Sequence, residues 1–144
     1  MAAVDDVDKL IEQFQLALGE FFKGNPEPVK NLFSHREDVS LANPLGPPAR
    51  GRDEVAQTIE RAASNFTDGE VVGFENVAKY VTPELACVVW LERAKVKLGG
   101  MEDLAPSVLR VTMVFRPEGD TWKVVHRHAD PITTAQPAES VIQD

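Results

Sequence analysis

The second half of the chain carries four long β-strand patterns separated by turn signals. Apolar and polar residues alternate, and β-branched types recur, over 71–82, 85–98 and 107–117, and again between Asp120 and Pro131. Short stretches rich in glycine, proline and acidic residues separate these segments. Because short connections join antiparallel neighbours, the pattern predicts an antiparallel sheet.

Helical patterns occupy the first half. Apolar residues between Asp5 and Phe22 fall on one stripe of a 3.6-residue helix, and a second stripe runs from Asp53 to Phe66. A short helical segment over 28–33, a strand over 38–42 and a proline-rich loop over 43–51 lie between them. The sequence therefore predicts α+β architecture, with a curved antiparallel sheet wrapped against two or three N-terminal helices.

Size and charge limit the classes of partner. The 144 residues predict one domain, residues 1–133, followed by a loose tail over 134–144. A formal charge of −8 argues against a nucleic-acid or anionic-membrane partner. No secretory signal or membrane-length apolar run is visible, and Cys87 has no second cysteine with which to pair. These features predict a cytoplasmic protein that binds neither nucleic acid nor membrane.

Two histidines near the end of the last predicted strand are the first candidates for chemistry. His126 and His128 are two residues apart, so regular alternation places both on one face, in line with Trp122. They could act as general acid and base, with Asp130 orienting His128. They could bind a metal with Glu92 as a third ligand, although the further ligands of known metal sites are missing. They could also be satisfied structurally at the sheet rim.

Glu92 and Arg110 form a second candidate pair. Each charge interrupts an apolar strand, which is costly unless the two pair or face a wet pocket. A cross-strand ion pair on an exposed face is the alternative. If Arg110 faces a cavity, its guanidinium would hold a carboxylate or enolate oxygen of a ligand.

Three further residues are candidates for the pocket. The Asn43 amide could bind a ligand or an oxyanion, or it could bond to the backbone and start the Asn-Pro turn. Trp90 and Tyr80 would supply pocket wall or core. No metal ligand set and no cofactor is assigned, because proton abstraction next to a carbonyl needs only a base and charge stabilisation.

Two passages of the sequence resemble the SnoaL-like branch of the NTF2-like superfamily. They are Asp38-Val-Ser-Leu-Ala-Asn-Pro-Leu-Gly-Pro-Pro-Ala-Arg-Gly51 and Trp122-Lys-Val-Val-His-Arg-His-Ala-Asp130, and the resemblance spans about residues 5–132. It implies a conical barrel whose open end holds an apolar pocket and whose outer sheet face often forms dimers. The superfamily includes ketosteroid isomerase, polyketide cyclases and the association domain of calmodulin-dependent kinase II, in which an arginine resembling Arg110 lines the cavity.

These observations lead to one main functional hypothesis. No phosphate loop, nucleophile elbow or zinc spacing occurs, which excludes dehydrogenase, kinase, α/β-hydrolase and zinc-hydrolase classes. The chain is expected to be a cofactor-free isomerase, cyclase or dehydratase acting on a small apolar or acidic carbonyl or polyketide-like molecule. A non-catalytic ligand-binding or oligomerisation domain is the alternative. Apolar residues on both faces of the 107–117 strand predict a homodimer through the outer sheet face.

Overall fold

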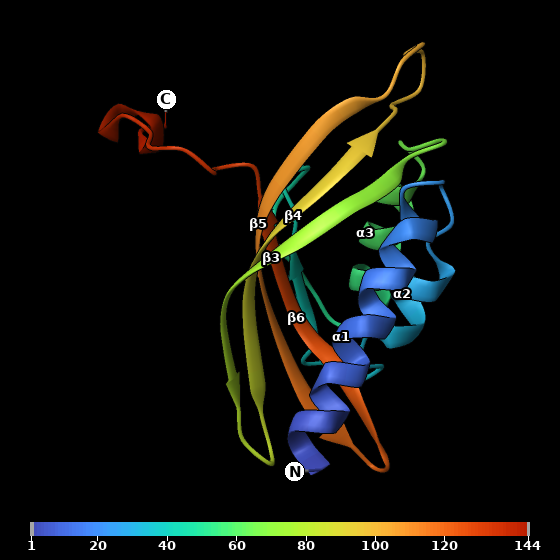
Figure 1. The fold of residues 1–144 in the computed structure, drawn as a ribbon, viewed down its shortest axis with the longest axis vertical. Helices are drawn as coiled ribbons and strands as arrows, with labels where there is room; N and C mark the ends of the chain where they lie inside the picture. The colour runs from blue at the N-terminus through green and yellow to red at the C-terminus, as the bar shows by residue number, and fades with distance from the viewer. Residues whose placement is uncertain (1, 144) are drawn as a thin grey trace.

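The fold consists of three α-helices packed on one side of a six-stranded sheet (Figure 1). The computed structural model describes residues 2–143. Its elements, in chain order, are α1 (Ala2–Phe21), α2 (Glu27–Leu32), β1 (Ser40–Ala42), β2 (Ala49–Arg50), α3 (Arg52–Ala63), β3 (Glu70–Val81), β4 (Ala86–Val96), β5 (Ala105–Glu118), β6 (Thr121–Asp130) and a short 3₁₀ helix, Ala138–Val141. The predicted α+β architecture is confirmed.

The sheet has the strand order β2-β1-β6-β5-β4-β3. Strands β3 to β6 form the predicted antiparallel meander. The expectation of a wholly antiparallel sheet is wrong at one edge, because β1 runs parallel to β6 through the register Ser40 to His126 and Ala42 to His128. The short strand β2 lies within the stretch predicted as loop. Strands β2 and β3 are the two edges of the sheet and do not pair with each other, so the curved sheet does not close into a barrel.

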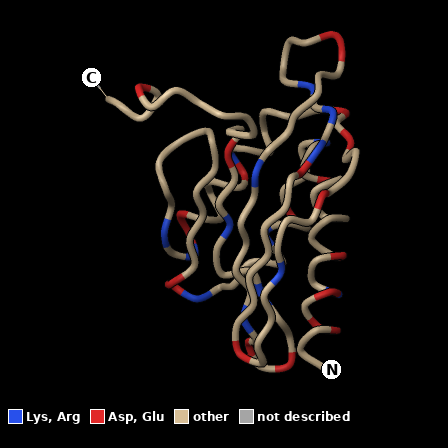
Figure 2. The backbone as a smooth tube through the Cα atoms, turned by 60° about the vertical axis from the view of Figure 1, so that its left-hand side comes forward, with Lys and Arg blue, Asp and Glu red and all other residues tan. Residues whose placement is uncertain are grey.

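The helices cover the concave face of this sheet. Helix α1 buries one stripe, from Val7 to Leu18, as its period predicts. The core continues into the inward-facing residues of the long strands, including Val88, Met113 and Phe115. Asp and Glu residues lie along α1 and at the loops, and Lys and Arg residues are dispersed among them (Figure 2). Within residues 2–143, no helix is both long and apolar enough to span a membrane.

A β-bulge in β6 sets the direction of its functional side chains. Phe115 pairs with Val124 while the preceding Val114 pairs with His126, so Val125 is an extra residue in β6. A bulge of this kind reverses the alternation beyond it. Trp122 and Val124 therefore face the core, whereas past the bulge the odd-numbered residues face inward.

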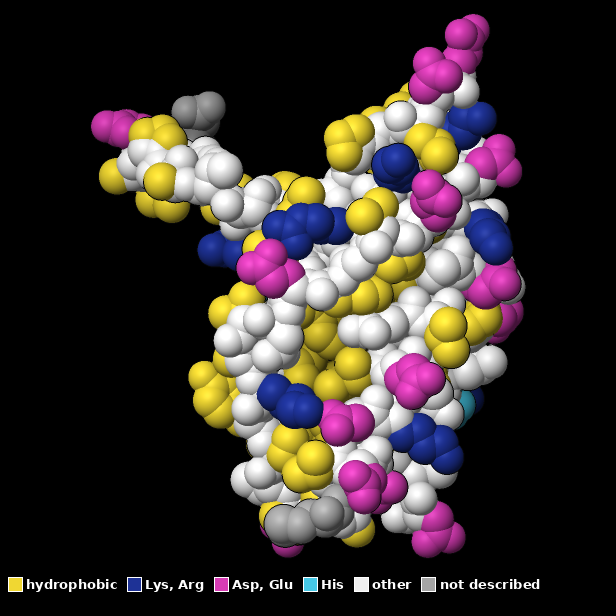
Figure 3. Space-filling model, viewed as in Figure 1, with side chains coloured by type: hydrophobic (Ala, Val, Ile, Leu, Met, Phe, Trp, Pro, Cys, Tyr) yellow, Lys and Arg dark blue, Asp and Glu magenta, His cyan; other side chains and the backbone are white. Residues whose placement is uncertain are grey.

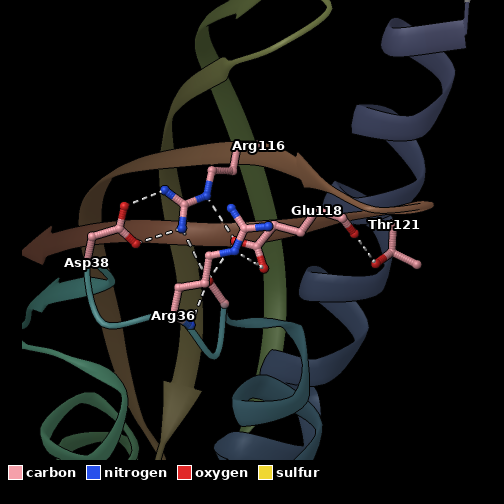
Figure 4. Close-up of polar contacts among 6 residues, drawn as sticks. Arg36, Asp38, Arg116, Glu118 and Thr121 are labelled. Carbon is pink, nitrogen blue, oxygen red and sulfur yellow. Dashed lines mark hydrogen bonds and ion pairs between the residues drawn. The ribbon is translucent and has the colours of Figure 1, made fainter.

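An ionic network joins the loop before β1 to the end of β5 (Figure 4). The Arg116 guanidinium donates two hydrogen bonds of 2.6 Å to the Asp38 carboxylate, and its Nε donates to Glu118 at 2.9 Å. The Ser34 hydroxyl donates to the same Glu118 carboxylate at 2.6 Å, and Arg36 lies 3.8 Å from it. These contacts fix the loop against the sheet and so place β1 beside β6.

Candidate functional site

A cavity of about 260 Å³ lies between the helices and the concave face of the sheet. Apolar side chains from all three helices and from the sheet form most of its wall. The polar side chains of the lining are Asn43, Glu92, Ser107 and Arg127. A small concave site with an apolar wall and a few convergent polar groups is typical of a small-molecule pocket. The lining residues are Phe14, Leu18, Phe21, Phe22, Val29, Phe33, Leu41, Asn43, Pro44, Leu45, Ile59, Ala62, Phe66, Glu92, Val96, Leu98, Ser107, Leu109, Arg127 and Ala129.

The charged groups of this lining form one buried ion pair. Glu92 on β4 is 1% exposed and Arg127 on β6 is 8% exposed. Arg127 Nη2 donates to Glu92 Oε2 at 2.8 Å, and Nη1 donates to Oε1 at 3.1 Å. This bidentate geometry offsets the cost of removing both charges from water. The alternation of β4 and the bulge of β6 bring the two side chains to the same face.

Neighbouring side chains hold each partner in place. The Trp90 indole donates to Glu92 Oε1 at 3.2 Å. The Arg127 guanidinium lies 5.3 Å from the centre of the Phe14 ring and 3.7 Å from the Met113 sulfur. Glu92 Oε1 thus accepts two hydrogen bonds, whereas Oε2 accepts one and keeps a free lone pair. Among the described residues, none accepts a hydrogen bond from Arg127 Nε, so this donor is also free to bind a ligand atom.

Asn43 is the other predicted residue in the lining. Its side-chain oxygen accepts a hydrogen bond from the Leu45 amide at 3.0 Å. This is the backbone-capping turn that the sequence offered as an alternative to ligand binding. The Asn43 amide nitrogen is not used by that bond, so a role in binding stays a prediction.

The two histidines do not line the cavity. The expectation that they share a face with Trp122 is wrong, because the bulge at Val125 turns His126 and His128 to the outer face of the sheet. There the Ser40 hydroxyl lies 2.7 Å from His126 Nδ1, and His128 Nε2 lies 2.9 Å from Asp130. Burial and the nearby His128 lower the pKa of His126, while hydrogen bonding with Ser40 opposes the shift.

Arg110 and Asp130 also lie on the outer face. The expectation of an Arg110–Glu92 ion pair or a shared cavity is wrong, because Arg110 pairs in register with Leu91 and its side chain is 56% exposed. Its Nε donates to Asp130 at 2.7 Å. Burial raises the pKa of Asp130, but bonds from Arg110, the Ile132 amide and His128 outweigh it and lower the pKa overall.

The two aromatic candidates differ in position. Trp90 is buried and reaches the site indirectly, through its bond to Glu92. Tyr80 is 64% exposed on the outer face, so its placement as pocket wall or core is wrong. Within residues 2–143, no group of three or more His, Cys, Asp or Glu side chains is arranged to hold a metal ion.

Sequence reasoning missed Arg127, the central cation of the pocket. It lies between the two histidines in β6 and faces the cavity, whereas the sequence pattern placed the histidines on the inner face. Helix-borne wall residues such as Phe14 and Leu18 were recognised only as an apolar stripe. A signal was present in Val124-Val125, where two successive apolar residues break the strict alternation expected of a half-buried strand.

Comparison with known families agrees with the fold. Residues 9–133 match the model of the SnoaL-like domain family, and the chain belongs to this family. No curated protein sequence matches the chain.

Solved structures of several bacterial proteins share the NTF2-like fold. One is a protein of Streptomyces avermitilis provisionally named a dehydratase of the NTF2-like family (TM-score 0.76, 23% identity, covering 92% of this chain and 99% of the other). Another is a ketosteroid isomerase-like protein of Erwinia carotovora (TM-score 0.73, 14% identity, covering 90% of this chain and 96% of the other). A third, from Novosphingobium aromaticivorans, is provisionally named a scytalone dehydratase (TM-score 0.72, 16% identity, covering 92% of this chain and 95% of the other). At these identities the likeness concerns the fold.

Proposed function

We propose that the cavity binds a small, largely apolar molecule through one oxygen-bearing group placed beside Arg127. The observation that carries this proposal is the distribution of polarity: an apolar wall around one fixed ion pair, in which Arg127 Nε keeps a free donor. A ketone, phenol or carboxylate oxygen fits such a donor. The volume of about 260 Å³ favours a ligand of one or two rings.

A matched set of bicyclic probes tests the binding proposal. We expect 2-naphthoic acid or 2-tetralone to perturb NMR signals of the cavity residues, and naphthalene to bind at least about tenfold more weakly. Arg127→Met should remove this discrimination. Arg110→Met is the matched control, because it removes an arginine from a neighbouring strand on the opposite face. If Arg127→Met still favoured the oxygen-bearing probes over naphthalene by the same factor as Arg110→Met, the role of Arg127 would be refuted.

A second candidate function is acid–base catalysis of the isomerase, cyclase or dehydratase kind. It is supported by Glu92, the titratable carboxylate of the lining, whose Oε2 has a free lone pair. The names of two structural neighbours point in the same direction. Glu92 would accept a proton from the carbon next to a carbonyl, and Arg127 would stabilise the resulting enolate oxygen; return of the proton to another position completes the reaction.

Isotope exchange tests this chemistry without knowledge of the natural substrate. In D₂O, the protein should accelerate exchange of the acidic protons of 2-tetralone, as followed by NMR. Glu92→Gln keeps the shape of the side chain but removes the base, and should return the rate to that of buffer while the ketone still binds. His128→Gln is the control on the outer face. An unchanged rate in Glu92→Gln would exclude this base.

We further propose that the protein forms a homodimer through the outer sheet face. Support comes from the apolar residues that this face presents between its charged margins: Val89 and Leu91 of β4, and Val108 and Val114 of β5. No element of the described chain covers them. Light scattering at micromolar concentration should give twice the monomer mass, and a monomeric mass would refute the dimer. A cytoplasmic location stays a prediction.

A further inference from the structure

The C-terminal segment, residues 131–143, leaves the sheet as a projecting arm. In Figures 1 and 2 it points away from α1, on the side of the sheet that the helices leave bare. All of these residues are exposed, and the side-chain hydrogen bonds of 133–143 stay within the arm. Nothing in the described chain therefore holds its far end against the body.

The root of the arm is fixed, however. The Asp130 carboxylate binds Arg110 and His128 on the outer face and accepts a hydrogen bond from the Ile132 amide at 2.9 Å. Pro131 restricts the backbone inside this turn, and Pro137 stiffens the arm further along. These contacts hold the root of the arm against the outer face of the sheet.

The far end of the arm is apolar and unusually exposed. Val141 is 79% exposed and Ile142 is 74% exposed, the highest values among the exposed large hydrophobic residues of the described chain. Hydrophobic side chains on the arm are visible in Figure 3. Exposed aliphatic residues on a stiff, rooted segment indicate a surface that is covered in an assembly.

We propose that this arm packs across the outer sheet face of a second copy of the chain. The proposal rests on the homodimer proposed above and adds the element that holds the two copies together. Both complementary surfaces lie on the same side of one chain, so a twofold axis would let each arm reach the other copy's face. The segment from Pro131 to Ile142 spans up to about 40 Å when extended, more than the width of β4 to β6.

Charge also fits a second copy. The charged side chain of residues 131–143 is Glu139, next to the apolar end of the arm. The outer face carries Arg93 and Arg110 beside its apolar centre, where they pair with Glu75 and Asp130. Across a partner's face, Val141 and Ile142 would cover Val89, Leu91, Val108 and Val114, and Glu139 would lie near an arginine.

The first test places charges at the end of the arm. In the full chain, Val141→Asp with Ile142→Asp should raise the dimer dissociation constant at least about tenfold, as measured by sedimentation equilibrium. Leu16→Asp is the matched control, because Leu16 is a 72% exposed aliphatic residue on α1, remote from the arm. The control should leave the constant within about twofold. An equally tight dimer in the arm variant would overturn the arm proposal yet leave the homodimer standing, whereas a monomeric wild-type chain would overturn both.

The second test locates the contact itself. In a Cys87→Ser background, Ser140→Cys provides a single cysteine on the arm, to which a benzophenone label is attached. Light then cross-links the label to whatever it contacts. We expect a product of twice the monomer mass, with the attachment mapped to β4 or β5 of the other copy. Attachment only within the same chain would show that the arm folds back on its own sheet, and would overturn the proposal.

Discussion

At the scale of single residues, Glu92 and Arg127 form a unit rather than two independent charges. Each satisfies the other in a buried site, and Trp90 adds a third bond. Removing one partner leaves the other charge buried without compensation, whereas removing both leaves an apolar floor.

We therefore predict opposite outcomes for single and double substitutions of this pair. Arg127→Met should lower the free energy of unfolding by about 3–5 kcal/mol, because the Glu92 carboxylate stays buried and unpaired. Glu92→Met combined with Arg127→Met should recover most of that loss. Urea unfolding followed by circular dichroism measures both. If the double variant loses as much stability as the Glu92→Met and Arg127→Met single variants added together, the residues do not act as a coupled pair.

The sequence could identify Glu92 as unusual but not Arg127 as its partner. Glu92 interrupts an apolar strand in phase with Val88 and Trp90, so the local pattern places it inward. The direction of Arg127 depends on the bulge at Val125, and a bulge arises from how two strands pair rather than from one strand alone. Because Val125 is one extra residue in β6, Arg127 faces the cavity and the two histidines face outward.

At the scale of elements, Arg116 ties the loop before β1 to β5 across the edge of β6. The hydrogen bonds from Arg116 lower the pKa of Asp38. For Glu118, burial raises the pKa, but bonds from Ser34 and Arg116 outweigh it and lower the pKa overall. Because β1 is held to the sheet by only three paired residues, this network is expected to contribute to its attachment.

Arg116→Gln should therefore loosen the loop without unfolding the sheet. We expect a loss of about 1–2 kcal/mol, since the network combines a half-exposed carboxylate with a largely buried one. Amide exchange should accelerate in residues 34–42 and stay unchanged in β4. Arg93→Gln, which removes a partly exposed arginine paired with Glu75, should cost less than about 1 kcal/mol. Equal exchange in residues 34–42 of the two variants would contradict this role.

The long elements were predictable because their signals are local. The stripe of α1 and the alternation of β3 to β6 lie within single segments, and short turns specify antiparallel neighbours. The parallel pairing of β1 with β6 joins segments far apart in the chain, and β2 has only two residues. Neither this pairing nor so short a strand produces a periodic sequence pattern from which it could be predicted.

At the scale of the whole molecule, one sheet separates two surfaces. Inward residues of β4 and β6 build the cavity, and outward residues of β4 and β5 form the proposed interface. Because successive residues of a strand point to opposite faces, a substitution can alter one surface and leave the side chains of the other unchanged.

Leu91→Glu tests this separation. Leu91 lies on the outer face beside the inward-facing Glu92. The new charge should prevent dimer formation, since it would be buried without a partner in the interface. Binding of 2-naphthoic acid in the cavity should change by less than about twofold. Light scattering and NMR titration measure the two properties separately, and a parallel loss of both would show that the cavity depends on assembly.

The pH dependence of stability combines groups from the whole molecule. The pKa of His126 is lowered in the folded protein, so below its ordinary value of about 6.5 the unfolded chain binds the proton more readily. The free energy of unfolding should therefore fall as the pH decreases from neutral. His126→Gln should flatten this upper part of the profile, while His35→Gln, on an exposed loop, serves as the control.

A second fall is expected in more acidic solution. The folded state lowers the pKa values of Asp38, Glu118 and Asp130, so their contribution is complete above their ordinary pKa values near 4 and is lost as the pH falls through the lower folded values. Arg116→Gln should reduce this acidic limb and leave the upper one intact, because it removes a partner of Asp38 and Glu118 but none of His126. Denaturation curves between pH 3 and 8 would contradict the assignment if both limbs changed together.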